Sequence, residues 1–163
     1  MTNNDTVRPH DAPANAAGTG LLARWNALAD LLGRCIPHDL LALAGRLSIA
    51  AIFFYSGRTK VEGFLGVTDG AIDLFTNEYK VPLLSPELAA HLAAYAEHFF
   101  PLLLVLGLAT RLSALALLGM TLVIQLFVYP DAWPTHLSWA AILLYLAGRG
   151  AGTLSLDRAF GIR

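Results

Sequence analysis

Ionisable side chains interrupt an apolar stretch in the middle of the chain, at Glu97 and His98 in AYAEHFFPLLL (94–104). A carboxylate and an imidazole can hydrogen-bond a polar ligand or bind a cation. Pro101 removes the helical hydrogen bond to the carbonyl of Glu97, which must find another partner in an apolar environment. The segment therefore predicts a polar feature within an apolar helix, either a binding site or a structural hinge.

Arg46 and Gln125 are the residues expected beside Glu97. Arg46 lies about six residues into the first apolar stretch, where an unpaired arginine costs several kcal/mol. If the two helices run in opposite directions, the Arg46 and Glu97 backbones differ in depth by roughly 8 to 10 Å. The sequence thus predicts an Arg46–Glu97 ion pair, with Gln125 at a similar depth to Glu97 and His98 nearby. The alternative is a pair that only fixes helix register.

Histidines suggest a second chemistry. His91 and His98 share one stripe of the second apolar stretch with Tyr95, and His136 is expected at the outer mouth of the fourth. Because imidazole binds copper well, His91, His98 and His136 are candidate metal ligands. Two histidines two turns apart cannot chelate one ion by themselves, and hydrogen bonds to neighbouring helices explain each histidine equally well.

The composition points to a membrane. Of 163 residues, 56% are hydrophobic and 14% charged, against about 25% charged in soluble domains. Between residues 99 and 129 the only charge is Arg111. The net charge of −1 provides no basic stripe for nucleic acid, and the single Cys35 excludes an intrachain disulfide or a cysteine metal cage.

The apolar stretches predict an all-α fold, a four-helix transmembrane bundle within residues 37–152. The expected spans are about 40–56, 88–110, 112–129 and 134–148, each near the length that crosses a bilayer. Ser85, Pro86 and Glu87 are typical of a helix start, ahead of the second span. The segment between the first two spans contains a pattern at Ile72, Phe75 and Tyr79 that predicts a short extracytoplasmic helix.

The remaining segments flank the bundle. Residues 1–20 have no apolar core or cleavage site, so we expect a disordered arm and not a signal peptide. Residues 21–36 predict an amphipathic helix, lying in the headgroup plane or packed on neighbouring helices. Residues 153–163 are expected to form a cytoplasmic tail.

The distribution of basic residues predicts the orientation. With the amino terminus inside, seven basic residues face the cytoplasm and three face outward, which favours two cytoplasmic termini. The cytoplasmic set is Arg8, Arg24, Arg34, Arg111, Arg149, Arg158 and Arg163, and the outer set is Arg58, Lys60 and Lys80. The outer loops also collect acidic residues that could attract cations.

Three sequence segments carry a resemblance to a known family. RLSIAAIFFYSGRTKVEGF, AEHFFPLLLVLGLATRLSALALL and GRGAGTLSLD follow one another between residues 46 and 157 and resemble the DoxX family of small bacterial membrane proteins. The resemblance implies a four-helix bundle in the bacterial inner membrane with cytoplasmic termini. It also implies a link to redox complexes, because the family is named after a subunit of an archaeal thiosulfate:quinone oxidoreductase and some relatives are associated with oxidant defence. VIQLFVYPDAWPTH resembles relatives found with copper-responsive peptides.

Three functions follow as hypotheses. The first is a subunit of a redox or stress-response membrane complex that contacts quinone near Arg46, Glu97 and His98; any enzymatic role would be as a membrane subunit of an oxidoreductase complex. The second is a copper-handling membrane protein. The third is a scaffold without chemistry. The expected partners are the lipid bilayer and either other proteins or further copies of this chain.

Overall fold

Residues 20–162 are described in a computed structural model, and the predicted arm at residues 1–20 lies almost wholly outside them. The chain divides into two units, Met1–Pro37 and His38–Arg163. In the first, helix α1 (Leu21–Cys35) has no buried residue. Its leucines and Trp25 are exposed. An amphipathic helix that contacts a membrane or a partner protein has such an exposed apolar face.

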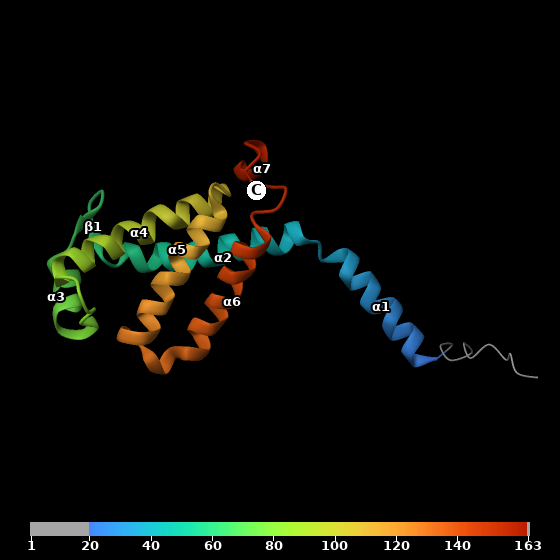
Figure 1. The fold of residues 1–163 in the computed structure, drawn as a ribbon, viewed down its shortest axis with the longest axis horizontal. Helices are drawn as coiled ribbons and strands as arrows, with labels where there is room; N and C mark the ends of the chain where they lie inside the picture. Colours follow the sequence, from blue (N-terminus) through green and yellow to red (C-terminus); the bar gives the residue numbers. More distant parts are fainter. Residues whose placement is uncertain (1–19, 163) are drawn as a thin grey trace, which may run out of the picture. The chain divides into compact units, whose positions relative to one another are not determined.

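Four helices pack together in the second unit (Figure 1): α2 (His38–Arg58), α4 (Pro86–Leu106), α5 (Thr110–Val123) and α6 (Trp133–Arg149). Helix α2 packs on α4 and α6, and α5 packs on α4 and α6. A π-helical turn, η2 (Ile124–Val128), extends α5, and the short 3₁₀ helix η3 (Pro130–Ala132) leads into α6. Helix α7 (Leu156–Ala159) follows the bundle.

Three of these helices are long and apolar enough to cross a membrane: His38–Arg58, Pro86–Leu106 and Thr110–Val128. Helix α6 has 17 residues, at the lower limit of what a bilayer requires. The largest difference from the expected helix bounds is at the end of the second helix. The second helix ends at Leu106 and not near 110, because Gly107 adopts a left-handed conformation (φ 65°) that closes the helix.

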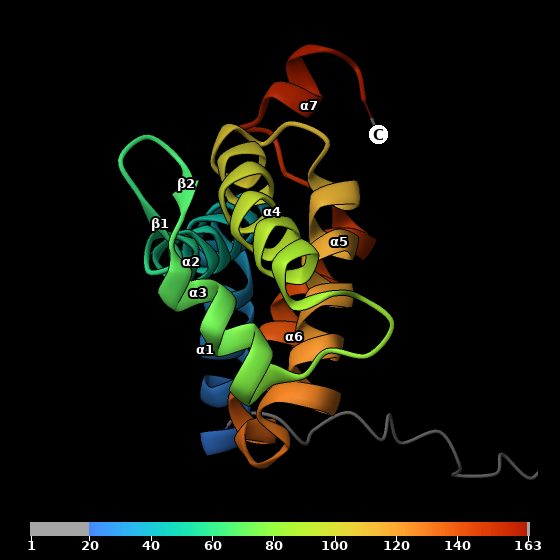
Figure 2. The same ribbon diagram turned by 90° about the vertical axis from the view of Figure 1, so that its left-hand side faces the viewer.

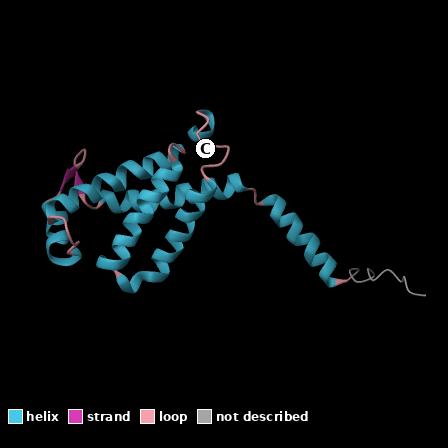
Figure 3. Ribbon diagram, viewed as in Figure 1, coloured by secondary structure: helices cyan, strands magenta, loops and turns pink. Residues whose placement is uncertain are grey.

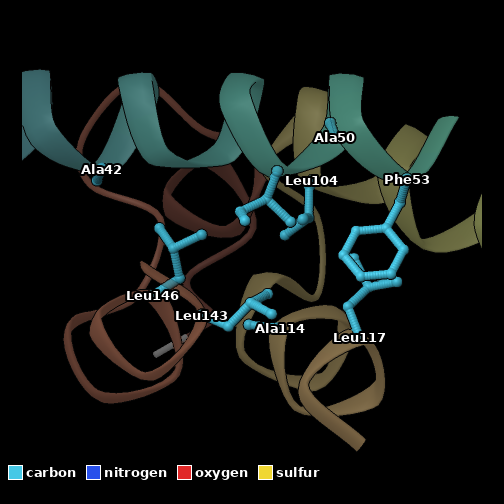
Figure 4. Packing of buried hydrophobic residues seen from close by; sticks show 9 residues of the cluster. Ala42, Ala50, Phe53, Leu104, Ala114, Leu117, Leu143 and Leu146 are labelled. Carbon is cyan, nitrogen blue, oxygen red and sulfur yellow. The ribbon is translucent and has the colours of Figure 1, made fainter. Parts of the chain in front are cut away.

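The core lies where α2 meets the other three helices (Figure 4). Ile49 and Phe53 of α2 contact a cluster that includes Leu104, Leu117 and Leu143, all of them completely or almost completely buried. The opposite faces carry exposed leucines and phenylalanines, as expected of helices surrounded by lipid.

The segment between α2 and α4 caps one end of the bundle (Figure 2). It contains a two-stranded antiparallel hairpin, β1 (Val61–Glu62) and β2 (Gly66–Val67), then α3 (Asp69–Leu74) and the π-helical turn η1 (Phe75–Tyr79). The helix expected here is present, but the hairpin is a correction to the all-α prediction (Figure 3). Phe75 packs against Ala89 and Ala90, so the small residues of α4 accommodate the cap.

Close approach of α2 and α4 depends on Gly57. A Cβ atom at Gly57 would lie 2.9 Å from Cβ of Glu97 and 2.9 Å from the His98 ring. Contacts that short do not occur between carbon atoms in well-packed proteins, so the helices would have to separate.

Replacing Gly57 by alanine should therefore destabilise the bundle by about 1–3 kcal/mol through overpacking. Thermal unfolding in detergent, followed by circular dichroism, measures the change. Gly119→Ala is the matched control, because no atom lies within 4 Å of a Cβ at that helical glycine. The control should be as stable as the unmodified chain or slightly more so. A Gly57→Ala protein of undiminished stability would contradict the packing described here.

Candidate functional site

Lys60 enters the interior through a tight turn that follows α2. The Lys60 N–H donates to the carbonyl of Gly57 at 3.0 Å, and the Thr59 hydroxyl donates to the carbonyl of Ser56 at 2.7 Å. The carbonyl of Lys60 accepts a hydrogen bond from the N–H of Thr68 at 3.0 Å. These bonds hold the lysine where its side chain folds back along the last turn of α2.

The Lys60 ammonium forms an ion pair with Glu97 of α4. Its Nζ atom lies 2.7 Å from Glu97 Oε2 and also donates to the hydroxyl and the carbonyl of Ser56, at 3.0 and 3.2 Å. The Ser56 hydroxyl donates to Glu97 Oε1 at 3.4 Å. The two charged side chains are only 8% and 4% exposed, so hydrogen bonds replace water around both charges.

This ion pair forms the polar part of a cavity of about 170 Å³. The rest of the lining is largely apolar and aromatic and comes from every helix of the bundle and from the cap. Members of this wall include Phe53, Phe75, Met120, Val123, Ile124 and Trp139. A few polar groups in an apolar wall are typical of a ligand site.

Both π-helical turns contribute to the same cavity. Phe75 and Tyr79 come from η1, and Ile124 and Val128 come from η2. A π turn is rare, costs stability relative to an α turn, and occurs often at functional sites. Two such turns around one cavity therefore favour a functional role for it.

Tyr79 and Tyr129 connect the two π-helical regions. The Tyr129 hydroxyl donates to the Tyr79 hydroxyl at 3.4 Å, and the rings lie 5.6 Å apart in an edge-to-face arrangement. Burial, together with this hydrogen bond, raises the pKa of Tyr79 above the ordinary value of a phenol. Tyr79 thus stays protonated at neutral pH and keeps a hydrogen to donate.

His136 and Gln125 form a second polar pair beside the cavity. His136 Nδ1 lies 2.7 Å from Gln125 Oε1, and Gln125 Nε2 donates to the carbonyl of Pro130 at 2.8 Å. His136 lines the cavity together with Trp139, whose ring is 5.2 Å from the imidazole. Gln125 does not line this cavity, but its amide fixes the orientation of the imidazole that does.

The predicted Arg46–Glu97 ion pair is wrong. Arg46 is buried, but its guanidinium donates to the carbonyl of Leu154 at 2.6 Å and to that of Leu104 at 3.5 Å. Glu97 lies opposite Gly57, eleven residues further along α2, and eleven helical residues span roughly 16 Å. The two residues differ in depth by more than the ends of the spans predict, because α2 and α4 are offset along their axes.

The three candidate metal ligands lie apart. His91 Nδ1 lies 2.8 Å from the carbonyl of Glu87, and His98 Nδ1 lies 2.6 Å from that of Ala94, while His136 is paired with Gln125. Within residues 20–162 no group of three or more His, Cys, Asp or Glu side chains could hold a metal ion. Within that part of the chain, the three histidines do not form one shared metal site. His98 packs on Phe54 and does not line the Glu97 cavity.

Two residues that the sequence does not single out are important in the structure. The sequence predicts Lys60 in an outer loop, but its position four residues after Ser56 allows it to fold back on the helix end. Asp157 is expected in a tail, yet its carboxylate accepts hydrogen bonds from the N–H groups of Ala109 and Thr110, at 2.7 and 2.9 Å. The start of α5 has no capping side chain of its own, and its first N–H groups need an acceptor. This need is the signal that points to a carboxylate from another part of the chain.

Comparison with known proteins identifies the family of this chain. The DoxX family model matches residues 41–130, more than half of the 163-residue chain. Neither a search of curated proteins nor a search of solved structures returned a match. The matched segment contains both members of the ion pair, both π-helical turns and the cap between α2 and α4.

Removing one member of the ion pair should lower the stability of the protein more than removing both. Lys60→Met leaves the Glu97 carboxylate buried without a cation and should cost about 3–5 kcal/mol of stability. The double variant Lys60→Met/Glu97→Gln should recover most of this loss, since no uncompensated charge remains. Thermal unfolding in detergent measures both. Arg58→Met, which removes an exposed cation, is the control and should change little. Additive losses in the double variant would contradict the pairing.

Proposed function

Since this chain belongs to the DoxX family, we propose that it is a bacterial inner-membrane subunit of a redox or stress-response complex. In this proposal it binds a quinone ring in the cavity beside Lys60 and Glu97. The role proposed is ligand binding for a partner protein, with lipid around the apolar helices. The observation that carries the proposal is a buried, fully hydrogen-bonded ion pair in the wall of an apolar, aromatic cavity.

The chemistry of the lining suits a flat ring that carries carbonyl oxygens. The Tyr79 phenol keeps a hydrogen to donate to a quinone carbonyl. All three hydrogens of the Lys60 ammonium are in use, so Lys60 would donate to a quinone by giving up its longest bond, the 3.2 Å one to the Ser56 carbonyl, which also accepts the Thr59 hydroxyl. Phe53, Phe75 and Trp139 offer aromatic surfaces for the ring itself. An anionic ligand is disfavoured because Glu97 already neutralises the lysine.

The size of the cavity restricts the ligand. At about 170 Å³ it is smaller than the roughly 300–1,000 Å³ typical of sites for drug-sized molecules, so it suits one small ring system. A lipid tail attached to the ring would have to lie outside. An apolar groove on α5 and α6 shares His136 with the cavity and offers such a surface.

The membrane arrangement that we propose has four crossings with both termini in the cytoplasm. Helix α6 would be the short fourth crossing, with Trp133 and Tyr129 in the interface at one end and Arg149 at the other. Burial of Lys60 strengthens the charge asymmetry, since it removes one of the three cations assigned to the outer surface. The Lys60–Glu97 cavity would then lie in the outer half of the bundle.

The single cysteine provides a test of orientation. Cys35 is exposed at the end of α1, so a membrane-impermeant maleimide should label it in inverted membrane vesicles and not in intact spheroplasts. The control is Cys35→Ser/Phe64→Cys, which places the thiol at the exposed tip of the hairpin, expected on the outer side. Its labelling pattern should be reversed. Labelling of Cys35 in intact spheroplasts would rule out a cytoplasmic amino terminus.

Quinone binding is testable through Trp139, because quinones quench indole fluorescence on contact. In a Trp25→Phe/Trp133→Phe background, a short-chain ubiquinone or menaquinone should quench Trp139 with a saturable concentration dependence. In Lys60→Met/Glu97→Gln the midpoint should rise by about tenfold or more, as expected on losing a hydrogen bond from a charged donor.

The matched control keeps Trp25 alone, by Trp133→Phe/Trp139→Phe, because that ring is exposed on α1 and lines neither the cavity nor the groove. Quinone dissolved in the detergent should quench it in direct proportion to concentration, without saturation. Equal, unsaturable quenching of both tryptophans would overturn the proposal. A purely structural role would then be favoured, in which the ion pair affects stability alone.

A further inference from the structure

A second cavity, of about 600 Å³, lies at the end of the bundle opposite the hairpin cap. It is formed where α2 and α5 begin, α6 ends and the chain continues into α7. No residue that lines it also lines the Lys60–Glu97 cavity, so the two are separate features.

Three arginines from three different elements line this second cavity. Arg111 is in the first turn of α5, Arg149 ends α6, and Arg158 lies in α7. All three are exposed. The Arg111 Nη1 atom donates to the carbonyls of Ala147 and Gly148, at 2.7 and 2.9 Å, which fixes its guanidinium against the end of α6. In residues 20–162 the side chains of Arg149 and Arg158 have neither a hydrogen bond nor a carboxylate within 4 Å.

The acidic residues of the same cavity are already occupied. Asp39 accepts hydrogen bonds from the N–H and the hydroxyl of Thr153. Asp157 accepts the N–H groups of Ala109 and Thr110 at the start of α5. Both carboxylates keep their charges, so the three arginines leave the cavity with one net positive charge. Neither carboxylate lies within 4 Å of a cavity arginine in the described residues, so the guanidinium donors not used by the carbonyls of α6 face the cavity.

Backbone conformation keeps the guanidinium of Arg111 accessible. Gly150 has a φ of 80°, and a Cβ there would lie 3.6 Å from Nε and Nη2 of Arg111. Those are the atoms that do not bind the carbonyls of α6. The glycine thus leaves open the edge of the guanidinium that two oxygens of a phosphate group can contact together.

The location selects a lipid over a dissolved anion. Helix α2 has 21 residues, roughly 31 Å at 1.5 Å per residue, which matches a hydrocarbon core of about 30 Å. If α2 crosses the membrane as proposed, its start, where His38 and Asp39 line the second cavity, lies at the level of the headgroups. Exposed Leu112 and Ile162 line the cavity beside the arginines and provide apolar contacts for the upper part of an acyl chain.

We propose that this cavity binds the phosphate group of an anionic phospholipid. Arg111 holds one face of the phosphate, and Arg149 and Arg158 approach it from α6 and α7. Basic pockets between membrane helices recognise such headgroups in general. Bound lipid would connect the start of α5, the end of α6 and α7, the three elements that carry these arginines.

The test measures lipid binding by the intact protein in a neutral detergent. Phosphatidylglycerol should be retained in native mass spectra and should raise the unfolding temperature, whereas phosphatidylcholine should do neither. Arg149→Gln/Arg158→Gln should weaken phosphatidylglycerol binding by about 30-fold, the order expected on losing two basic contacts at a membrane surface. Arg58→Gln, at the opposite end of the bundle, should bind as the unmodified protein does.

A competition experiment with inorganic phosphate shows whether the site binds a phospholipid or free phosphate. Phosphate should compete weakly with the lipid, because it lacks the apolar contacts. If phosphate alone gives the same stabilisation as phosphatidylglycerol, the assignment to a lipid is overturned. The proposed site is ruled out if the unmodified protein retains both lipids equally. It is also ruled out if Arg149→Gln/Arg158→Gln binds phosphatidylglycerol as tightly as the unmodified protein does. Stabilisation of the unmodified protein by phosphatidylglycerol over phosphatidylcholine does not depend on how well the variant folds.

Discussion

The Lys60–Glu97 ion pair is the constraint around which the rest of the bundle is arranged. A carboxylate in the middle of an apolar helix must be neutralised, and the nearest cation comes from a turn that has to fold back toward it. That turn requires α2 and α4 to approach closely, which Gly57 permits. It also fixes where the hairpin and α3 begin, because the carbonyl of Lys60 accepts the N–H of Thr68.

The bundle has two polar ends of different character. At the capped end, charges are paired and buried beside a small aromatic cavity. At the other end, arginines are exposed beside a larger cavity, and the carboxylates there satisfy backbone N–H groups. This contrast underlies the two ligand classes that we propose, a neutral hydrogen-bonding ring at the first end and an anionic headgroup at the second.

Much of the helical framework could be predicted from the sequence, because its signals are local. Ser85 accepts the N–H of Leu88, as its position before Pro86 suggested, and Glu97 is buried. The partners of buried charges could not be predicted, since they depend on how two helices are offset. Arg46 and Glu97 both lie within long helices, yet the offset gives Arg46 the carbonyls of Leu104 and Leu154.

The role of Asp157 in capping α5 has a consequence for the order of assembly. The N–H groups of Ala109 and Thr110, and the guanidinium of Arg46, obtain their acceptors from residues 154–157. The chain is synthesised from its amino terminus, so the helices that carry these donors are made before the acceptors. Until residues 154–157 emerge, the two N–H groups and the Arg46 guanidinium must be hydrated or bonded to another partner.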